Sequence, residues 1–246
     1  MNSAARLCTQ LKGTSTRLTL KSGRGTHRHP ARVTRGIQMG PPLPSTQLGH
    51  VLGCKDAAVT LAVWLDYACP FCKTFYNTFT SEVSPHYGDR LKLVVYHQVQ
   101  PWHPQSTMLH EAALAVTKVG GEEAFWKFSK ALFETQTDFF DANTYNKSRA
   151  AIYQDLAALA LSSTGVAAAD VLALLARTEV GEQLNTGNAC TQELKFHVKL
   201  GRQTGIHVSP TTLLNGMICD TSSSWSLDQW REFLDPHCAA PAVAKM

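Results

Sequence analysis

Cys69 and Cys72 stand close together in "DYACPFCKTF", residues 66–75, directly after a strongly apolar run. A cysteine pair at this spacing serves as zinc ligands, as a structural disulfide, or as a thiol couple that makes and breaks disulfides. A thiol reacts as its thiolate, and a free cysteine with a pKa of about 8.5 is only about 3% ionised at pH 7. Redox chemistry therefore requires a position that stabilises one of the two sulfurs as an anion.

The proline beside the pair predicts such a position. Pro70 fits the first turn of a helix. Cys69 is then expected at the helix N-terminus, where backbone N–H groups and the helix dipole favour an anion. Cys72, one turn later, is expected to point inward, stay protonated and resolve a mixed disulfide. This asymmetry, with one exposed and one buried thiol, suits disulfide exchange.

The other uses of the pair are weighed against the remaining cysteines and histidines. A zinc site normally takes four ligands, often as a second close pair. The chain has seven cysteines, an odd number at irregular spacing. We therefore expect no metal site, while a structural disulfide or an inert remnant of a redox fold stays open. The remaining candidate ligands do not show the spacing of a zinc site; they are Cys190, Cys219, Cys238, His86, His97, His103 and His110. The sequence does not decide whether any of these three cysteines form a disulfide.

The elements around the pair follow from hydrophobic periodicity. Residues 57–67 are short, β-branched and almost continuously apolar, as in a strand buried on both faces. A helix is expected from Pro70 to about residue 83, with Phe71, Phe75 and Phe79 on one apolar stripe. A second strand is expected over residues 90–99. Strand, helix and strand then form a right-handed parallel unit, and the cysteines lie where the first strand gives way to the helix.

The rest of the chain turns helical and then returns to strands. Asn215-Gly216 is a strong hairpin signal between two short strand-like runs. A closing helix is expected from Ser226 as N-cap. The pattern predicts an α/β protein with thioredoxin-like topology and a large all-helical insertion. Helices are expected over residues 104–121 (ending at Gly120-Gly121), 122–134, 148–165, 167–177 and, more weakly, 178–205.

Charge is unevenly distributed along the chain. The net charge is +4, yet residues 1–55 hold nine Lys or Arg and no acid, so the remainder is mildly acidic. We therefore expect no nucleic-acid partner. The basic, Ser- and Thr-rich start has the composition of a transit peptide, which predicts a mitochondrial or plastid location; otherwise a cytoplasmic one is expected. Translation from Met1 or from Met39 stays open. No apolar run approaches the length of a membrane span.

These observations predict five segments. They are a basic tail or transit peptide (1–45), a first thioredoxin-like half (46–103), a helical insertion (104–203), a second thioredoxin-like half (204–238) and a short tail (239–246).

Three stretches together resemble the DsbA-like branch of the thioredoxin superfamily. They are "DYACPFCKTF", "PWHPQST" and "VSPTTLLNG", and the resemblance covers about residues 48–236. It implies that Cys69 is the nucleophile, that Cys72 is the resolving cysteine and that Pro210 is a cis-proline facing them. It also implies that the backbone of Val208 and Ser209 binds a peptide substrate.

Further residues are assigned with less direct support. Phe71 and Trp102 are expected to contact substrate beside that loop, although a tryptophan is more often a core residue. Asp66 fits an acid often seen three residues before the first cysteine, and we expect it to hydrogen-bond locally rather than to transfer protons.

Two positions depart from the strongly oxidising bacterial members of this branch. Those proteins have His where Phe71 stands and a buried Glu where Val63 stands. Phe cannot stabilise a thiolate electrostatically, so an extreme reduction potential is not expected. Without the carboxylate, proton transfer to and from Cys72 is expected to be slower or to use water.

The expected function is exchange of disulfides with protein or glutathione substrates. Glutathione is the only co-substrate considered, no other cofactor is expected, and the chain is expected to be a monomer. One alternative is a redox-inert binding module that uses Phe71, Trp102 and Val208 as a contact surface. Another is an enzyme like the kappa-type glutathione transferases and their isomerase relatives, but these usually replace one or both cysteines.

Overall fold

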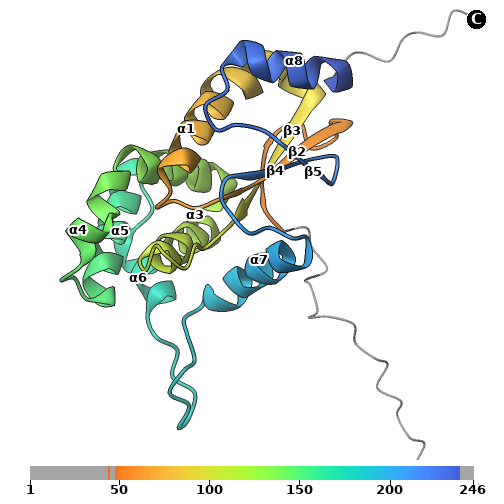
Figure 1. The fold of residues 1–246 in the computed structure, drawn as a ribbon. Helices are drawn as coiled ribbons and strands as arrows, with labels where there is room; N and C mark the ends of the chain where they lie inside the picture. Colours follow the sequence, from red (N-terminus) through yellow and green to blue (C-terminus); the bar gives the residue numbers. More distant parts are fainter. Residues whose placement is uncertain (1–43, 45–47, 239–246) are drawn as a thin grey trace, which may run out of the picture. The chain divides into compact units, whose positions relative to one another are not determined.

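A five-stranded mixed sheet forms the centre of the protein (Figure 1). The computed structural model describes residue 44 and residues 48–238. The strand order is β1-β3-β2-β4-β5, with β2 and β3 parallel and every other pairing antiparallel. The strands are β1 (His50–Gly53), β2 (Val59–Leu65), β3 (Leu91–His97), β4 (Thr211–Leu214) and β5 (Met217–Cys219).

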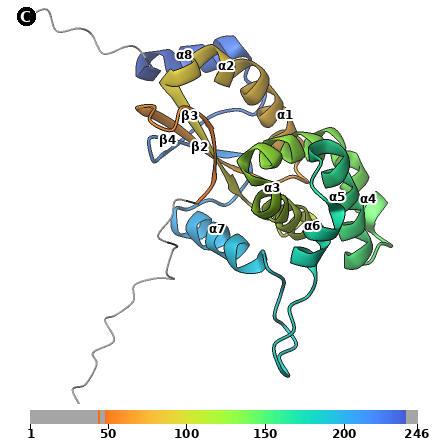
Figure 2. The same ribbon diagram turned by 180° about the vertical axis from the view of Figure 1, so that it is seen from behind.

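Helices cover both faces of this sheet, as the apolar β2 sequence predicts. Helices α1 (Pro70–Thr78), α2 (Ser84–Tyr87) and α8 (Leu227–Cys238) lie on one face (Figures 1 and 2). Helices α3 (Ser106–Glu134) and α7 (Thr191–Gln203) lie on the other. Strand β2 is therefore screened from solvent along its length.

The helix that follows the cysteines is confirmed, but its apolar stripe is shorter than expected. After α1 the chain continues through a π-helical turn, Phe79–Val83, into α2. Phe75 and Phe79 are buried and meet the Trp230 ring edge-on, with centroids 5.6 and 5.5 Å away. Phe71 is 66% exposed, in line with its expected contact with substrate, so only Phe75 and Phe79 of the stripe are buried. It lies in the first turn of α1.

The chain between β3 and β4 is mainly helical, as predicted. The expected break at Gly120-Gly121 is confirmed, because Gly121 has φ 75° and ψ −171° inside α3. Few residues other than glycine adopt this conformation. The remaining elements here are the 3₁₀ turn η3 (Gln136–Phe139), α4 (Asp141–Thr144), α5 (Arg149–Thr164) and α6 (Ala168–Leu175).

One predicted helix is largely wrong. Only α7 forms within residues 178–205. Gly181 (φ 50°) and Gly187 (φ 73°) lie in an irregular excursion before it, which Figure 1 shows reaching away from the rest of the fold. Within the excursion the side chain of Leu184 is 91% exposed. Glycines at positive φ stop the helix from starting earlier.

The second half of the fold matches the prediction closely. Asn215 and Gly216 have φ of 47° and 87°, the left-handed conformations of a tight hairpin turn between β4 and β5. The closing helix α8 is present. Strand β1 was not predicted, because four residues are too few to show a period.

The predicted segment boundaries stay predictions. The tails at 1–45 and 239–246, with both candidate start positions, lie outside the described residues except for position 44. Across the described residues, no helix has the length and apolar character needed to cross a membrane.

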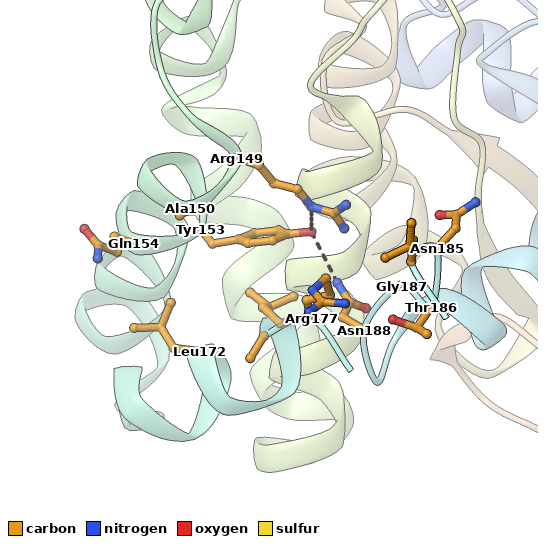
Figure 3. A pocket seen from close by; sticks show the side chains of 13 residues that line it. Arg149, Ala150, Tyr153, Gln154, Leu172, Arg177, Asn185, Thr186, Gly187 and Asn188 are labelled. Atoms are coloured by element: carbon orange, nitrogen blue, oxygen red, sulfur yellow. Dashed lines mark hydrogen bonds between the residues drawn. The ribbon is translucent and has the colours of Figure 1, made fainter. Parts of the chain in front are cut away.

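A pocket of about 570 Å³ lies between α5, α6 and residues 184–188 (Figure 3). Its polar groups bind one another. The Tyr153 hydroxyl accepts from Arg149 Nε at 2.8 Å and from Asn188 Nδ2 at 3.2 Å, and it donates to Glu111. Arg149 also pairs with the buried Glu111 at 2.8 Å. These bonds fasten the excursion to α3 and α5 and include no residue of the cysteine site.

Candidate active site

Cys69 caps the N-terminus of α1, as the position of Pro70 predicts. Its backbone is extended (φ −89°, ψ 120°), and Pro70 opens the helix. The Cys69 carbonyl accepts from the N–H groups of Cys72 (3.1 Å) and Lys73 (3.3 Å). The cysteines therefore lie at the junction of strand and helix, where helix N–H groups can stabilise an anion.

Both sulfurs are more enclosed than expected. Cys69 keeps 6% of its surface exposed and Cys72 none. The predicted exposed thiol is thus wrong in degree, although the order of the two is right. The reason is the loop before β4: Cys69 Sγ lies 3.5 Å from the Ser209 carbonyl oxygen, so this loop partly covers it.

The environment separates the acidities of the two thiols. A hydrogen bond from Cys72 lowers the pKa of Cys69 to about 6; burial opposes this, and the N–H groups of Cys72 and Phe71 add to it. Burial raises the pKa of Cys72 well above its ordinary value, and the hydrogen bond to Cys69 raises it further. At pH 7 a thiol with pKa 6 is about nine-tenths ionised. One thiolate beside one thiol is therefore the stable reduced form.

The loop across from the pair has the expected cis peptide bond between Ser209 and Pro210. Its conformation is held by Thr211, whose hydroxyl donates to the Val208 carbonyl at 2.7 Å. Through its contact with Cys69, the loop brings a backbone segment to the sulfur.

Apolar side chains are exposed around this contact. Phe71, Trp102 and Val208 are 66%, 57% and 54% exposed, so a core position for Trp102 is excluded. A pocket of about 240 Å³ is lined by Trp102 and Gln100, by other residues of the segment after β3, and by residues of α7 and of the loop that follows α7. Phe71 in the first turn of α1 and Val208 beside Ser209 thus offer apolar contact area near the sulfur.

Gln136, in η3, fixes the loop that carries Cys69. It is 2% exposed, and its amide nitrogen donates to the carbonyls of Tyr67 (2.7 Å) and Cys69 (2.9 Å). The sequence analysis missed this residue, because its distance along the chain gives no pattern.

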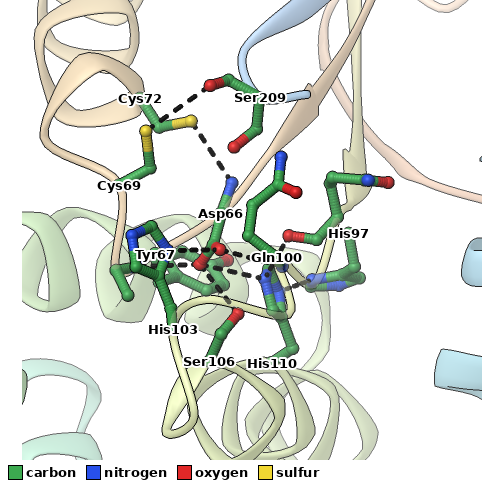
Figure 4. Close-up of polar contacts among 12 residues, drawn as sticks. Asp66, Tyr67, Cys69, Cys72, His97, Gln100, His103, Ser106, His110 and Ser209 are labelled. Carbon is green, nitrogen blue, oxygen red and sulfur yellow. Dashed lines mark hydrogen bonds and ion pairs between the residues drawn. The ribbon is translucent and has the colours of Figure 1, made fainter. Parts of the chain in front are cut away.

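Asp66 is a buried carboxylate with four donors (Figure 4). It accepts from the N–H groups of Ala68 (2.9 Å) and Gln100 (3.1 Å), from the Ser106 hydroxyl (2.8 Å) and from His103 Nδ1 (2.9 Å). The expected local hydrogen bonding is confirmed. Two of these donors, His103 and Ser106, lie in "PWHPQST", residues 101–107, which begins four residues after the end of β3.

The charge on Asp66 is stabilised despite burial. Burial alone raises the pKa of this carboxyl, but His110, and then His103 and the Ala68 N–H, together hold it below its usual value. Val63 is fully buried and carries no charge, so it does not replace the buried glutamate of the strongly oxidising proteins. The buried negative charge near the cysteines is that of Asp66. The Asp66 N–H donates to Cys72 Sγ at 3.3 Å, which links this residue directly to the resolving cysteine.

A group of buried histidines lies behind Asp66. His97 Nδ1 is 2.7 Å from His110 Nδ1, and His97 Nε2 is 3.1 Å from His50 Nε2. These histidines are too far apart in the sequence for their contacts to be predicted from it. Within the described part of the chain, no set of three or more His, Cys, Asp or Glu side chains is arranged to hold a metal ion. The six described cysteines are free thiols.

Comparison with known proteins gives a family for this arrangement. Residues 45–236 match the family model described as Thioredoxin. Disulfide bond formation protein D of Bacillus subtilis is 34% identical over 97 residues, 39% of this chain and 43% of that protein. A Na⁺/H⁺ antiporter NhaA 1 of Mycolicibacterium gilvum is 33% identical over 117 residues, 47% of this chain but 18% of that protein. The chain thus spans less than half of each curated relative.

A solved structure supports the fold. Oxidised BdbD from Bacillus subtilis aligns with a TM-score of 0.60 at 23% identity, covering 78% of this chain and 94% of that one. With the family match over most of its length, this chain belongs to the thioredoxin family.

Proposed function

We propose that this protein is a thiol–disulfide oxidoreductase of the DsbA-like kind, with Cys69 as nucleophile and Cys72 as resolving cysteine. The observation that carries the proposal is the opposite shift of the two thiols, with a Cys69 pKa of about 6 beside a protonated Cys72. The name of the Bacillus subtilis relative, a disulfide bond formation protein, supports the same class.

The reaction follows from this asymmetry. The Cys69 thiolate attacks one sulfur of a substrate disulfide; a Cys69–substrate disulfide forms, and the other substrate sulfur leaves with the bonding electron pair. Cys72 then loses its proton and attacks Cys69 Sγ. The Cys69–Cys72 disulfide forms, the second substrate thiolate leaves, and the substrate has gained two electrons. The reverse sequence oxidises a substrate dithiol.

The proposed substrates are protein disulfides or dithiols. An extended peptide would hydrogen-bond the backbone of Val208 and Ser209, and its apolar side chains would contact Phe71 and Trp102. Support comes from the exposure of these side chains and from the Ser209 carbonyl 3.5 Å from Cys69 Sγ. Glutathione is proposed as an alternative co-substrate, and the monomer as the working form.

The compartment is proposed from composition alone. The basic start of the chain would direct it to a mitochondrion or plastid. Residues 1–45 fused to a fluorescent protein should then reach that organelle, and a diffuse cytoplasmic signal would contradict the proposal.

The decisive test is the redox cycle itself. Purified protein should change between two thiols and one disulfide, and Cys69→Ser should abolish reduction of insulin disulfides. The reduction potential of the pair gives the direction, because values near −270 mV mark a reductant and values near −120 mV an oxidant. If Cys69 alkylates no faster than free cysteine and insulin is never reduced, the proposal is wrong.

The redox-inert alternative makes the opposite prediction. A binding module would keep its function in cells when both cysteines are replaced by serine. Loss of function in that variant would rule the alternative out.

A further inference from the structure

Three buried imidazole rings connect the protein surface to Asp66. His50 Nδ1 contacts the carboxylate of Glu122, which is half exposed, at 3.1 Å. His50 Nε2 contacts His97 Nε2 at 3.1 Å, and His97 Nδ1 contacts His110 Nδ1 at 2.7 Å. His110 Nε2 lies 3.8 Å from Asp66 Oδ1. The line is continuous from solvent to the carboxylate behind the cysteines (Figure 4 shows its inner half).

Counting hydrogens along the line fixes its charge. A contact between two ring nitrogens needs one proton, and a nitrogen facing an oxygen acceptor needs one of its own. His50 Nδ1 faces only carboxylate oxygens, and His110 Nε2 faces the Gln98 carbonyl at 3.2 Å as well as Asp66. The two ends and two internal contacts therefore require four protons. Three neutral imidazoles carry only three, so the fully bonded line holds one excess proton.

That excess proton has two favourable positions. Burial and the neighbouring histidines lower the pKa of His97 well below its usual value, so the positive charge rests at either end of the line. At one end it faces Asp66, and at the other Glu122. Moving one proton across each of the two ring–ring contacts transfers the charge between His110 and His50 without moving any ring.

The surrounding groups leave this count unchanged. His197 Nδ1 accepts from the backbone N–H of His97 at 3.2 Å, and burial lowers its pKa to about 3, so it stays neutral. His103 donates to the other oxygen of Asp66. The ring of Phe125 stacks on His50 with centroids 3.4 Å apart.

One further titratable group faces the inner rings. The Tyr67 ring lies 4.8 Å from that of His110, but its hydroxyl bonds to Ser129 at 2.7 Å. Burial raises the pKa of Tyr67 far above neutrality, so it adds no charge to the line.

We propose that His50, His97 and His110 form a proton line between Glu122 at the surface and Asp66 behind the Cys69–Cys72 pair, and that this line serves the resolving cysteine. The proposal rests on the proposed function and deepens it. Cys72 is fully buried, yet it must lose a proton at each disulfide formation and regain one at each reduction. A direct route to solvent is closed to it.

The proton line gives the Cys72 proton a destination in the resolving step. As Cys72 attacks Cys69, its proton passes to the Asp66 carboxylate, because His110 Nε2 already holds a proton. The neutralised Asp66 no longer stabilises the positive charge at His110. Two hops follow, and a different proton leaves His50 Nδ1 for Glu122 and solvent. Reduction runs the path inward. The catalytic cycle, which releases and recovers one proton, thus returns the line to its starting arrangement.

Asp66 and Gln100 occupy the gap between line and sulfur. The Asp66 N–H already binds Cys72 Sγ at 3.3 Å. The Gln100 amide is buried and points from Asp66 towards Ser209 and the sulfurs in Figure 4. Neither its nitrogen nor its oxygen hydrogen-bonds another described residue, so the oxygen can accept a hydrogen bond and the N–H can donate one between Asp66 and the sulfurs.

The first test counts protons without needing redox activity. The double variant Cys69→Ser/Cys72→Ser, labelled with ¹⁵N-histidine, should show by ring-nitrogen chemical shifts four N–H protons shared by His50, His97 and His110 near neutral pH. A total of three would overturn the proposal, whatever the protein's activity.

The second test measures the step itself. Wild-type protein reacted with a chromogenic aromatic disulfide releases a second coloured thiolate when Cys72 resolves the mixed disulfide. Glu122→Gln should slow this release about threefold and His97→Phe about tenfold or more, each with an altered pH profile and solvent isotope effect. The matched control is Glu123→Gln, a neighbouring carboxylate paired with Lys127 and absent from the line.

The outcomes separate the two proposals. Release at the wild-type rate in a folded Glu122→Gln and a folded His97→Phe protein would overturn the proton line while leaving the oxidoreductase intact. If Glu122→Gln alone folds, an unchanged rate in that variant suffices to overturn it. If wild-type protein forms no mixed disulfide at all, the proposed function fails, and the proton count still tests the line.

Discussion

The two cysteines differ because a hydrogen bond between them works in opposite directions. The Cys72 thiol donates to the Cys69 thiolate, which lowers the pKa of Cys69 and raises that of Cys72. Burial reinforces the difference, since it penalises the charged form of the deeper sulfur more. Reactivity is thereby confined to the sulfur beside the Ser209 loop.

Alkylation of Cys69 should follow this ionisation. The rate with iodoacetamide should rise with an inflection near pH 6 and level off above pH 7, because the thiolate is the reacting species. Mass spectrometry of Cys72→Ser and Cys69→Ser proteins over a pH series checks the assignment. An inflection at the position of free cysteine, about pH 8.5, would contradict it.

Phe71→His should make the pair more oxidising. An imidazole beside Cys69 adds a donor and partial positive charge near the thiolate, which should lower the Cys69 pKa further by about one unit. A change of that size raises the reduction potential by about 30 mV. Redox titration against glutathione measures it, and Phe71→Leu is the uncharged control. Because Phe71 is exposed, neither change should alter stability, and equal potentials in the two variants would refute the argument.

At the scale of elements, the site depends on a turn far from the cysteines in sequence. The 3₁₀ turn η3 contributes Gln136, whose two donated bonds hold the Tyr67 and Cys69 carbonyls. The insertion between β3 and β4 therefore helps to shape the cysteine loop.

Gln136→Met should loosen that loop. Methionine keeps the length but donates no hydrogen bond, so the buried Tyr67 carbonyl loses its donor at a cost of about 1–3 kcal/mol in unfolding free energy. Denaturant unfolding measures the loss, and faster hydrogen exchange in residues 67–69 should accompany it. Gln154→Met, on the exposed face of α5, should stay within about 0.5 kcal/mol of wild type. Equal stability of the two variants would show that Gln136 does not hold the loop.

Local signals account for which elements were predictable. Long amphipathic runs, the Gly120-Gly121 break and the Asn215-Gly216 turn each have a backbone reason that resides in a few adjacent residues, so their elements were predicted. The four residues of strand β1 are too few to show a hydrophobic period. The extension of α7 back to residue 178 was a propensity argument that two glycines at positive φ override.

At the scale of the whole molecule, thiol ionisation is linked to folding. The folded pKa of Cys69, about 6, lies below that of the unfolded chain. Stability gained from the thiolate is therefore fully present above about pH 9, declines as pH falls and is lost below about pH 6.

Reduced wild-type protein should consequently gain stability relative to Cys69→Ala as pH rises from 6 to 9. The gain should amount to a few kcal/mol, measured by urea unfolding of both proteins under reductant. A constant difference across this range would show that the Cys69 pKa is not depressed in the folded state.

The sequence predicted the two sulfurs and their junction because each depends on neighbours in the chain, whereas the cis-proline at Pro210 was implied by the family resemblance. It could not predict the histidines behind them. His50, His97 and His110 come from β1, β3 and α3, and only the sheet order and the packing of α3 bring them together. Trp102 was expected to contact substrate although a tryptophan is more often a core residue, and its loop leaves it exposed at the surface.

The excursion before α7 divides the chain between the cysteines and Pro210. A protease that cuts near Leu184 would produce two fragments, one with both sulfurs and the other with the cis-proline loop. Pairing of β2 with β4 would hold the nicked halves together without a covalent link. Expressed separately, the fragments should be inert alone and regain disulfide exchange on mixing, which would turn the catalytic centre into a reporter of their reassembly.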